Sequence, residues 1–322
     1  MMPLQKLLKA EWSGLLLVVI LAITLIGYLK PSFLTPFNIQ ILLAAISVNM
    51  VIALAQMLIV GIGQMNLSVG AIGGLVAISF AGLMDVFQLP IPLAVLMGLL
   101  IGLAAGLFNG VIIAFTGISA FIITLASLSV FKGINLGITE AQPFYGVAES
   151  VKSFGNSSFI GTLPLLILPA LLALIGVWFL LNRMRFGRHV LAVGASPTAA
   201  GLVGISVRNI VIGTHALSGL LAAVAGMMVV ARLQIGQPTI GDDWLILSFA
   251  APVIGGAVLA GGHVNVIGTL LGVTTIAIIT QALVLFEIDP FIVQIFLGLL
   301  ILWAVGINRL RDLRLTLFSK PA

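Results

Sequence analysis

The sequence predicts an all-α integral membrane protein of about ten transmembrane helices, some of them short or broken. Three observations predict this class: 61% of the residues are hydrophobic, only 7% are charged, and the chain holds 36 glycines. A soluble domain carries about 25% charged residues, so this chain has too little charge to cover a water-exposed surface. Lipid requires backbone groups to pair within helices, and small residues let such helices approach closely. Residues 1–322 are predicted to form a single transmembrane domain.

The apolar runs give the individual spans when they are broken at prolines, polar glycine clusters and charges. Most runs approach the roughly 20 residues that a bilayer crossing needs. The predicted spans are residues 14–29, 39–61, 68–84, 92–116, 119–136, 163–181, 210–231, 245–260, 264–286 and 291–307. The third, fifth and eighth spans are short, which favours broken or re-entrant segments at these places.

Basic residues orient these spans, because cytoplasmic loops of membrane proteins carry an excess of Lys and Arg. A cytoplasmic N-terminus places ten basic residues inside and four outside. Those inside are Lys6, Lys9, Arg183, Arg185, Arg188, Arg208, Arg309, Arg311, Arg314 and Lys320, and those outside are Lys30, Lys132, Lys152 and Arg232. With ten spans, both termini and the loop 183–209 are then cytoplasmic, whereas Asp242 and Asp243 fall in an outside loop.

Few ionisable groups fall within the spans. Lys132 is the one charge set inside a predicted span, near its outer end, and we interpret it as an anchor that snorkels to the interface; a solute-binding or proton-coupling group is the alternative. His215 and His263 have no acidic partner in their own spans, and no carboxylate is placed at mid-span, so proton coupling is not expected. Zero cysteines exclude thiolate sites, and a net charge of +5 without a basic stripe argues against nucleic-acid binding. No catalytic residue and no metal site is predicted.

Residues 61–74 interrupt two apolar runs with glycines and small polar residues. Such a stretch can unwind. Its free backbone groups, with Gln64, Asn66 and Ser68, can line a pore without formal charge, which suits a neutral polyhydroxylated solute. The alternative is a polar cytoplasmic turn followed by a glycine-packed helix.

The longest cytoplasmic loop, residues 183–209, carries a helix signal of its own. Ser196 is a suitable N-cap and Pro197 is suited to a first helical position, which predicts a short helix over residues 197–202 that Gly204 ends. A short helix with apolar residues and basic flanks is typical of a docking contact. A simple connector rich in arginine is the alternative.

Five motifs of the chain combine into a family pattern. They are Asn66-Leu67-Ser68-Val69-Gly70, Arg185-Phe186-Gly187-Arg188, Ala192-Val193-Gly194 with Ala199-Ala200-Gly201-Leu202-Val203-Gly204-Ile205, Leu217-Ser218-Gly219-Leu220-Leu221-Ala222-Ala223-Val224-Ala225-Gly226, and Val253-Ile254-Gly255-Gly256-Ala257. In this order they resemble the permease subunits of bacterial monosaccharide ABC importers of the ribose, xylose and arabinose type. The resemblance runs from about residue 33 to residue 306, which is nearly the whole chain.

This resemblance implies a multi-pass subunit of the bacterial inner membrane that pairs with a second copy or a paralogue. Its further partners are a cytoplasmic ABC ATPase subunit and a periplasmic solute-binding protein. The family's coupling helix, which contacts the ATPase, matches Pro197, Ala199, Ala200, Gly201, Leu202, Gly204 and Ile205. ATP and Mg²⁺ are bound by the partner ATPase, since this chain has no Gly-Lys dipeptide, hence no phosphate loop, and holds no cofactor itself.

The chain departs from the family pattern at two places. Asn66 stands where the family usually has an acidic residue, so a solute contact there is uncharged. Thr198 precedes the Ala-Ala pair of the coupling segment, where the family commonly has Glu. Pro252 lies inside the eighth span and is expected to break it beside Gly255 and Gly256.

The predicted solute passage is weakly polar, because the binding protein already supplies recognition. The candidate residues are neutral hydrogen-bonding side chains within or beside spans: Asn66, Ser68, Asn109, Thr124 and Gln281. Hydrogen bonds between helices are the alternative role for each of them. Related importers of nucleosides, branched-chain amino acids or a furanone-type signalling molecule stay open as alternatives, and so does a self-sufficient facilitator. An intramembrane enzyme is disfavoured because no Ser/His, Asp/Asp or HExxH set falls inside a span.

Overall fold

The structure, a computed structural model, describes residues 12–289 together with 292, 295, 298–299 and 302. The predicted tenth span and the basic residues near both termini lie almost wholly outside these residues. The elements in chain order are α2 Ser13–Leu29, η1 Pro31–Leu34, α3 Pro36–Gly61, α4 Val69–Asp85, α5 Ile91–Thr116, α6 Ala120–Thr139, α7 Glu149–Asn156, β1 Ser158–Ile160, β2 Leu163–Pro164, α8 Ile167–Arg183, α9 Arg185–Ala195, α10 Pro197–Leu202, α11 Val207–Leu233, α12 Trp244–Ile254 and α13 Val266–Leu285.

The predicted all-α membrane class is confirmed in the described part of the chain. Five helices there are long and apolar enough to cross a membrane: α3, α5, α6, α11 and α13. The pair α8 and α9, bent by 73° at its break, adds a sixth if it is counted as one span. The helices α2, α4 and α12 are apolar but shorter.

Three predicted spans differ from the observed helices. The span predicted at 119–136, which was expected to be short and broken or re-entrant, is the continuous 20-residue helix α6. The span predicted at 163–181 begins as strand β2, which pairs antiparallel with β1, and its helix starts only at Ile167. The span predicted at 245–260 is a helix only as far as Ile254, because Gly256 adopts a left-handed φ of +90°. Pro252 lies inside this helix as expected.

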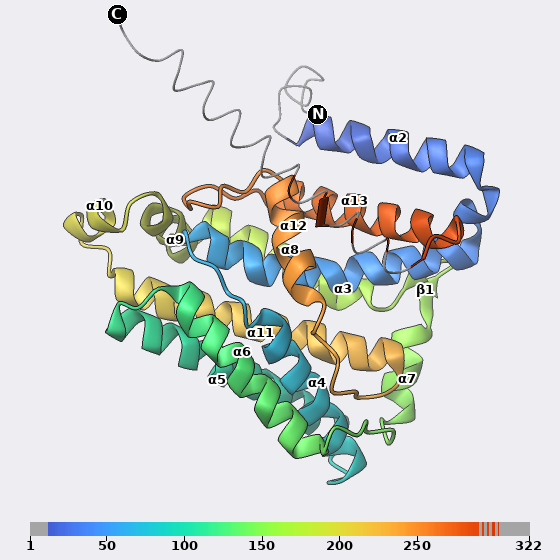
Figure 1. Cartoon of the computed structure of the whole chain (residues 1–322), viewed down its shortest axis with the longest axis horizontal. Helices are drawn as coiled ribbons and strands as arrows, with labels where there is room; N and C mark the ends of the chain where they lie inside the picture. The colour runs from blue at the N-terminus through green and yellow to red at the C-terminus, as the bar shows by residue number, and fades with distance from the viewer. Residues whose placement is uncertain (1–11, 290–291, 293–294, 296–297, 300–301, 303–322) are drawn as a thin grey trace, which may run out of the picture.

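The core is formed by α3 and α11, which run side by side through the middle of the molecule (Figure 1). Most residues in the second half of α3 are buried, so α3 is surrounded by other helices rather than by lipid. By contrast, α2, α6 and α8 expose many large apolar side chains. Such surfaces suit hydrocarbon, where an apolar side chain needs no cover.

The crossing of α5 and α11 depends on glycine. Gly98, Gly102, Gly106 and Gly110 recur every four residues on α5, so they form one stripe, and all four face α11. A Cβ added at Gly102 would collide with Ala223 and with the backbone of α11. The small residues Gly219 and Ala223 of α11 thus pack closely against α5.

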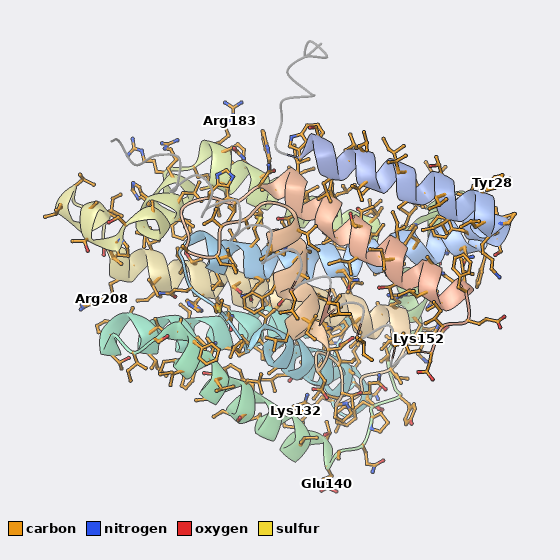
Figure 2. All side chains as sticks on the ribbon, turned by 45° about the horizontal axis from the view of Figure 1, so that its top comes forward. Tyr28, Lys132, Glu140, Lys152, Arg183 and Arg208 are labelled. Carbon is orange, nitrogen blue, oxygen red and sulfur yellow. The ribbon has the colours of Figure 1, made fainter. Side chains whose placement is uncertain are left out.

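The two ends of the molecule carry different elements. The short helix α10 projects beside α9 at one end, and the β1–β2 hairpin and α7 lie at the other (Figure 1). Figure 2 places Arg208 at the α10 end and Lys152 at the opposite end. These residues were predicted to lie on opposite sides of the membrane.

Candidate functional site

The break between α3 and α4 is held by a side-chain amide from the C-terminal part of α3. Helix α3 ends at Gly61 and α4 begins at Val69, so the backbone between them is irregular. Gln56 is fully buried, and its side-chain amide, in the orientation that satisfies both groups, donates to the carbonyl of Asn66 at 3.0 Å and accepts from its N–H at 3.2 Å. The amide thus replaces the helical partners that Asn66 lacks.

A second set of bonds joins the break to α5. The Oδ1 atom of Asn66 accepts from the backbone N–H of Ser68 at 3.0 Å and from its hydroxyl at 2.7 Å. The Nδ2 atom of Asn109, on α5, donates to the hydroxyl oxygen of Ser68 at 2.8 Å. These three side chains are fully buried. They therefore form one hydrogen-bonded chain between the break and the glycine-packed helix.

Thr124 attaches the same break to α6. Its hydroxyl oxygen accepts from the backbone N–H of Leu67 at 3.1 Å, while the hydroxyl donates to the carbonyl of Ala120 at 2.7 Å. The side chain of Thr124 is fully buried. The structure thus brings together four of the five residues that the sequence suggests for the passage. We call Gln56, Asn66, Ser68, Asn109 and Thr124 the polar break network.

The fifth predicted residue, Gln281, lies elsewhere. Its Nε2 atom, on α13, donates to Oδ1 of Asn38 near the start of α3 at 2.9 Å, and Asn38 donates in turn to the carbonyl of Ser32. Gln281 therefore ties α13 to the other end of α3 and, among the described residues, shares no hydrogen bond with the polar break network. Its role in the passage stays a prediction.

Buried His215 pairs with half-buried Gln64, a residue of the break between α3 and α4. The Nε2 atom of His215, on α11, lies 3.0 Å from Oε1 of Gln64. The partner of the imidazole is therefore a neutral amide. Sequence reasoning missed Gln56 as a functional residue, although a single amide within a long apolar run is a visible signal.

The structure gives Lys132 a partner that the sequence did not reveal. Its Nζ atom bonds to both carboxylate oxygens of Asp242, at 2.5 and 2.6 Å, and to the carbonyl of Pro238 at 3.1 Å. Asp242 had been placed in an outside loop, and the pair is separated by 110 residues in the sequence. Only the fold reveals this ion pair.

The predicted short helix over residues 197–202 is confirmed as α10. Ser196 caps it, since its hydroxyl oxygen accepts from the N–H of Ala199 at 3.2 Å, and Gly204 ends the turn with a φ of +83°. Ala200 faces inward and is buried, whereas Leu202 and Val203 are 86% and 77% exposed. A pair of apolar side chains thus projects from the tip of α10, uncovered by the part of the chain that the structure describes.

Glycines connect α9 to the break. The N–H of Gly262 donates to the carbonyl of Gly61 at 3.1 Å. A Cβ added at Gly194, on α9, would collide with the Gly61 carbonyl and with the Gly262 nitrogen, and one at Gly261 would lie 2.6 Å from the nitrogen of Gly63. We call Gly61, Gly63, Gly194, Gly261 and Gly262 the glycine junction. At this junction α9 touches the end of α3 backbone to backbone.

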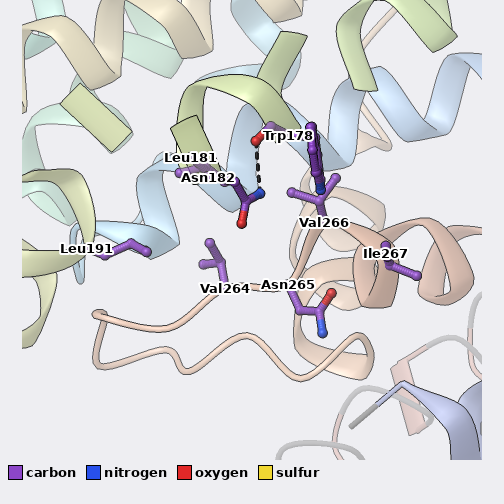
Figure 3. A pocket seen from close by; sticks show the side chains of 8 residues that line it. All are labelled: Trp178, Leu181, Asn182, Leu191, Val264, Asn265, Val266 and Ile267. Atoms are coloured by element: carbon purple, nitrogen blue, oxygen red, sulfur yellow. Dashed lines mark hydrogen bonds between the residues drawn. The ribbon is translucent and has the colours of Figure 1, made fainter. Parts of the chain in front are cut away.

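A cavity of about 280 Å³ lies beside the glycine junction, where α8, α9 and the start of α13 meet. Figure 3 shows its lining, with the side-chain amide of Asn182 donating to the carbonyl of Trp178 at 2.9 Å. Leu191 of α9 lines the cavity and Val264 faces it from the loop before α13. The C-terminal part of α9 therefore has free volume on one side and rigid backbone contact on the other.

With this geometry established, comparison with known proteins identifies the family. The family model of the branched-chain amino acid transport system / permease component matches residues 38–305. The chain belongs to this permease family. The permease is 35% identical to the ribose import permease protein of Bacillus subtilis, over 95% of this chain and 93% of that protein.

Further relatives extend the likeness. The permease is 31% identical to the D-allose transport system permease protein of Escherichia coli, over 96% of this chain and 94% of that protein. It is also 31% identical to the fructose import permease protein of Rhizobium meliloti, over 95% of this chain and 88% of that protein. No solved structure matches the permease.

Proposed function

We propose that this permease imports a monosaccharide, driven by ATP and fed by a binding protein. One observation carries the proposal: proteins named for ribose, allose and fructose import match it over nearly its whole length. The uncharged polar break network supports it, since a neutral polyhydroxylated solute needs no ionic partner there. The chain itself acts as the membrane subunit of the assembly and not as its enzyme.

The proposed arrangement has ten spans in the bacterial inner membrane with both termini in the cytoplasm. Nine of the ten predicted spans overlap helices of the structure, and the excess of basic residues on one side orients them. In this orientation α9 and α10 face the cytoplasm and the β1–β2 hairpin faces the periplasm. Two copies, or this chain and a paralogue, enclose the passage between them.

The proposed coupling contact is the tip of α10. Leu202 and Val203 insert into a cleft of the ATPase, because exposed apolar side chains in water gain by being covered. ATP binding brings the ATPase subunits together and moves α9 with them. The glycine junction carries this movement to the end of α3, and the cavity at Leu191 gives α9 room to shift.

The proposed response to this movement is a rearrangement of the polar break network. Asn66 Nδ2 and Asn109 Oδ1 are buried without a hydrogen-bond partner in this conformation. A buried amide without a partner is costly, so it favours a conformation in which these groups find one. Opening of the break toward the passage offers them the hydroxyl groups of the solute.

Reconstitution tests the proposed function. The chain is purified from its native membrane in mild detergent, its partners are identified by mass spectrometry, and the complex is placed in liposomes with labelled ribose, allose or fructose. We expect uptake of one of these sugars only with ATP, the ATPase and the binding protein present. ATP-independent uptake by the chain alone would overturn the proposal and favour a self-sufficient facilitator.

A second solute class rests on a specific relative. The chain is 34% identical to the autoinducer 2 import system permease protein of an Enterobacter species, over 86% of each chain. The same liposomes distinguish the two solutes by competition. An excess of autoinducer that abolishes sugar uptake indicates the signalling molecule, whereas unchanged sugar uptake excludes it.

A further inference from the structure

The ion pair of Lys132 and Asp242 lies at membrane depth. Lys132 is seven residues before Thr139, the last residue of the spanning helix α6, and twelve residues after Ala120, its first. At 1.5 Å per residue these separations are about 10 and about 18 Å along the helix. Figure 2 shows Lys132 on α6 well short of Glu140, which follows the helix end. The ammonium group is thus attached inside the apolar layer.

The segment that carries Asp242 turns back into the molecule after α11 ends at Leu233. Added Cβ atoms at Gly74 and Gly70, in the first two turns of α4, would collide with the carbonyls of Ile240 and Gly241. The start of α4 is itself deep, because Ser68 bonds to Asn109, which is seven residues, or about 10 Å, from the end of α5. Helix α12 therefore begins within the membrane and not at its surface.

The two carboxylates at the start of α12 are not covered by the described part of this chain. The side chain of Asp242 is 53% exposed and that of Lys132 is 28% exposed, and Asp243 is also exposed. Ionised groups at this depth avoid lipid and face a water-filled space or another protein surface. The face formed by Lys132, Asp242 and Asp243 therefore does not face hydrocarbon. We call it the charged face.

We propose that the charged face is a contact site for the hydroxyl groups of the solute, in the wall of the passage; this rests on the proposed function. Carboxylate oxygens accept hydrogen bonds from neighbouring hydroxyls, and an ammonium group donates to them, both with charge-assisted strength. The charges of Lys132 and Asp242 balance within the pair, so a neutral polyol fits without a charge of its own. The carbonyl of Pro238 holds the ammonium group in place.

A charge-swap experiment distinguishes a solute contact from an ion pair that only stabilises the fold. Asp242→Asn and Lys132→Met are each expected to lower ATP-driven sugar uptake by about tenfold, since each removes a charge-assisted bond. The double variant Lys132→Asp/Asp242→Lys restores the ion pair but exchanges donor and acceptor. We expect its uptake to stay low while its stimulated ATPase rate recovers. Recovery of wild-type uptake in the double variant would show that the ion pair only stabilises the fold and would overturn the proposal.

Thiol labelling tests the same face without relying on the swap. The chain has no cysteine, so a single cysteine reports its own surroundings. Asp243→Cys is treated with a charged, membrane-impermeant methanethiosulfonate, which reacts with the thiolate that forms in water. Val130→Cys is the matched control: Val130 is 49% exposed on α6, roughly 160° around the helix from Lys132.

We expect the cysteine at position 243 to react, the cysteine at position 130 to stay unlabelled, and the transported sugar to slow the reaction at 243. No reaction at 243, or equal rates with and without sugar, would overturn the charged face as a solute contact. This outcome is distinct from failure of the proposed function, in which the wild-type complex imports no monosaccharide at all. Labelling at 243 with protection by a solute other than a sugar would overturn the polyol assignment.

Discussion

The polar break network and the tip of α10 differ in where they direct their side chains. The network gathers polar groups and buries them completely, so the chain itself supplies most of their partners. The tip of α10 does the opposite, because it directs Leu202 and Val203 outward, where no described residue of the chain covers them. The first arrangement holds an irregular backbone in place from within. The second is complete only when another protein covers it.

The glycine junction lies between these two regions and determines how they influence each other. It has no side chains that can adjust, so a displacement of α9 meets backbone directly. Packed interiors transmit strain rather than absorb it. The comparison therefore predicts that changes at the junction affect both regions, whereas changes at either end affect one.

The largest effect is expected at the junction. In Gly194→Val the new side chain collides with the backbone at Gly61 and Gly262, and such overpacking costs about 1 to 3 kcal/mol. We expect ATP-driven uptake to be lost and the Tm in detergent to fall. Gly176→Val is the matched control, because a Cβ at Gly176, on α8, meets nothing within 4 Å. Wild-type uptake in Gly194→Val would show that the junction does not couple the two regions.

The next largest effect is expected at the tip of α10, the outer of the two regions compared. Leu202→Asp places a charge on the α10 tip, where the wild-type side chain makes little contact within this chain, so the Tm of the isolated permease should not change. Recovery of the ATPase in pull-down should fall by about tenfold, as for an apolar anchor at an interface. Leu202→Met retains the apolar contact and should bind normally. ATPase recovery equal in both variants would remove the α10 tip from the docking contact.

A smaller effect is expected inside the polar break network. Asn66→Leu removes the acceptor of both Ser68 bonds, and leaving such buried groups unpaired costs about 1 to 3 kcal/mol. We expect lower uptake and a lower Tm with unchanged ATPase recovery. Asn66→Asp keeps the acceptor atom and should retain more uptake than Asn66→Leu. If Asn66→Leu imports sugar at the wild-type rate, Asn66 has no part in the passage.

Much of this fold could be predicted from local patterns, and the exceptions have a common cause. Apolar runs predicted the helices because the length of a span and the residues that break it are local properties. The depth of α12 could not be predicted, since it depends on where Ile240 and Gly241 pack against α4. The partner of Lys132 likewise depends on that re-entrant path. Long-range packing, not propensity, decides both.

The candidate site could likewise be predicted only in part. Residue type was enough to select Asn66, Ser68, Asn109 and Thr124, because neutral polar side chains are scarce in apolar spans and tend to find one another there. Residue type could not show that these side chains hydrogen-bond to one another and do not line an open passage. It also could not separate them from Gln281, which has the same chemistry at the other end of α3.

The smallest effect is expected at Gln281 and tests whether its role differs from that of the polar break network. Gln281→Leu removes one hydrogen bond to Asn38 between α13 and α3, and such bonds in membrane helices are worth about 0.6 kcal/mol on average. We expect sugar uptake close to wild type and a slight fall in Tm. Loss of uptake at an unchanged Tm would instead place Gln281 in the passage, as its residue type alone suggests. Comparing this variant with Asn66→Leu therefore shows whether a polar side chain in this membrane protein matters for its chemistry or for its location at the break.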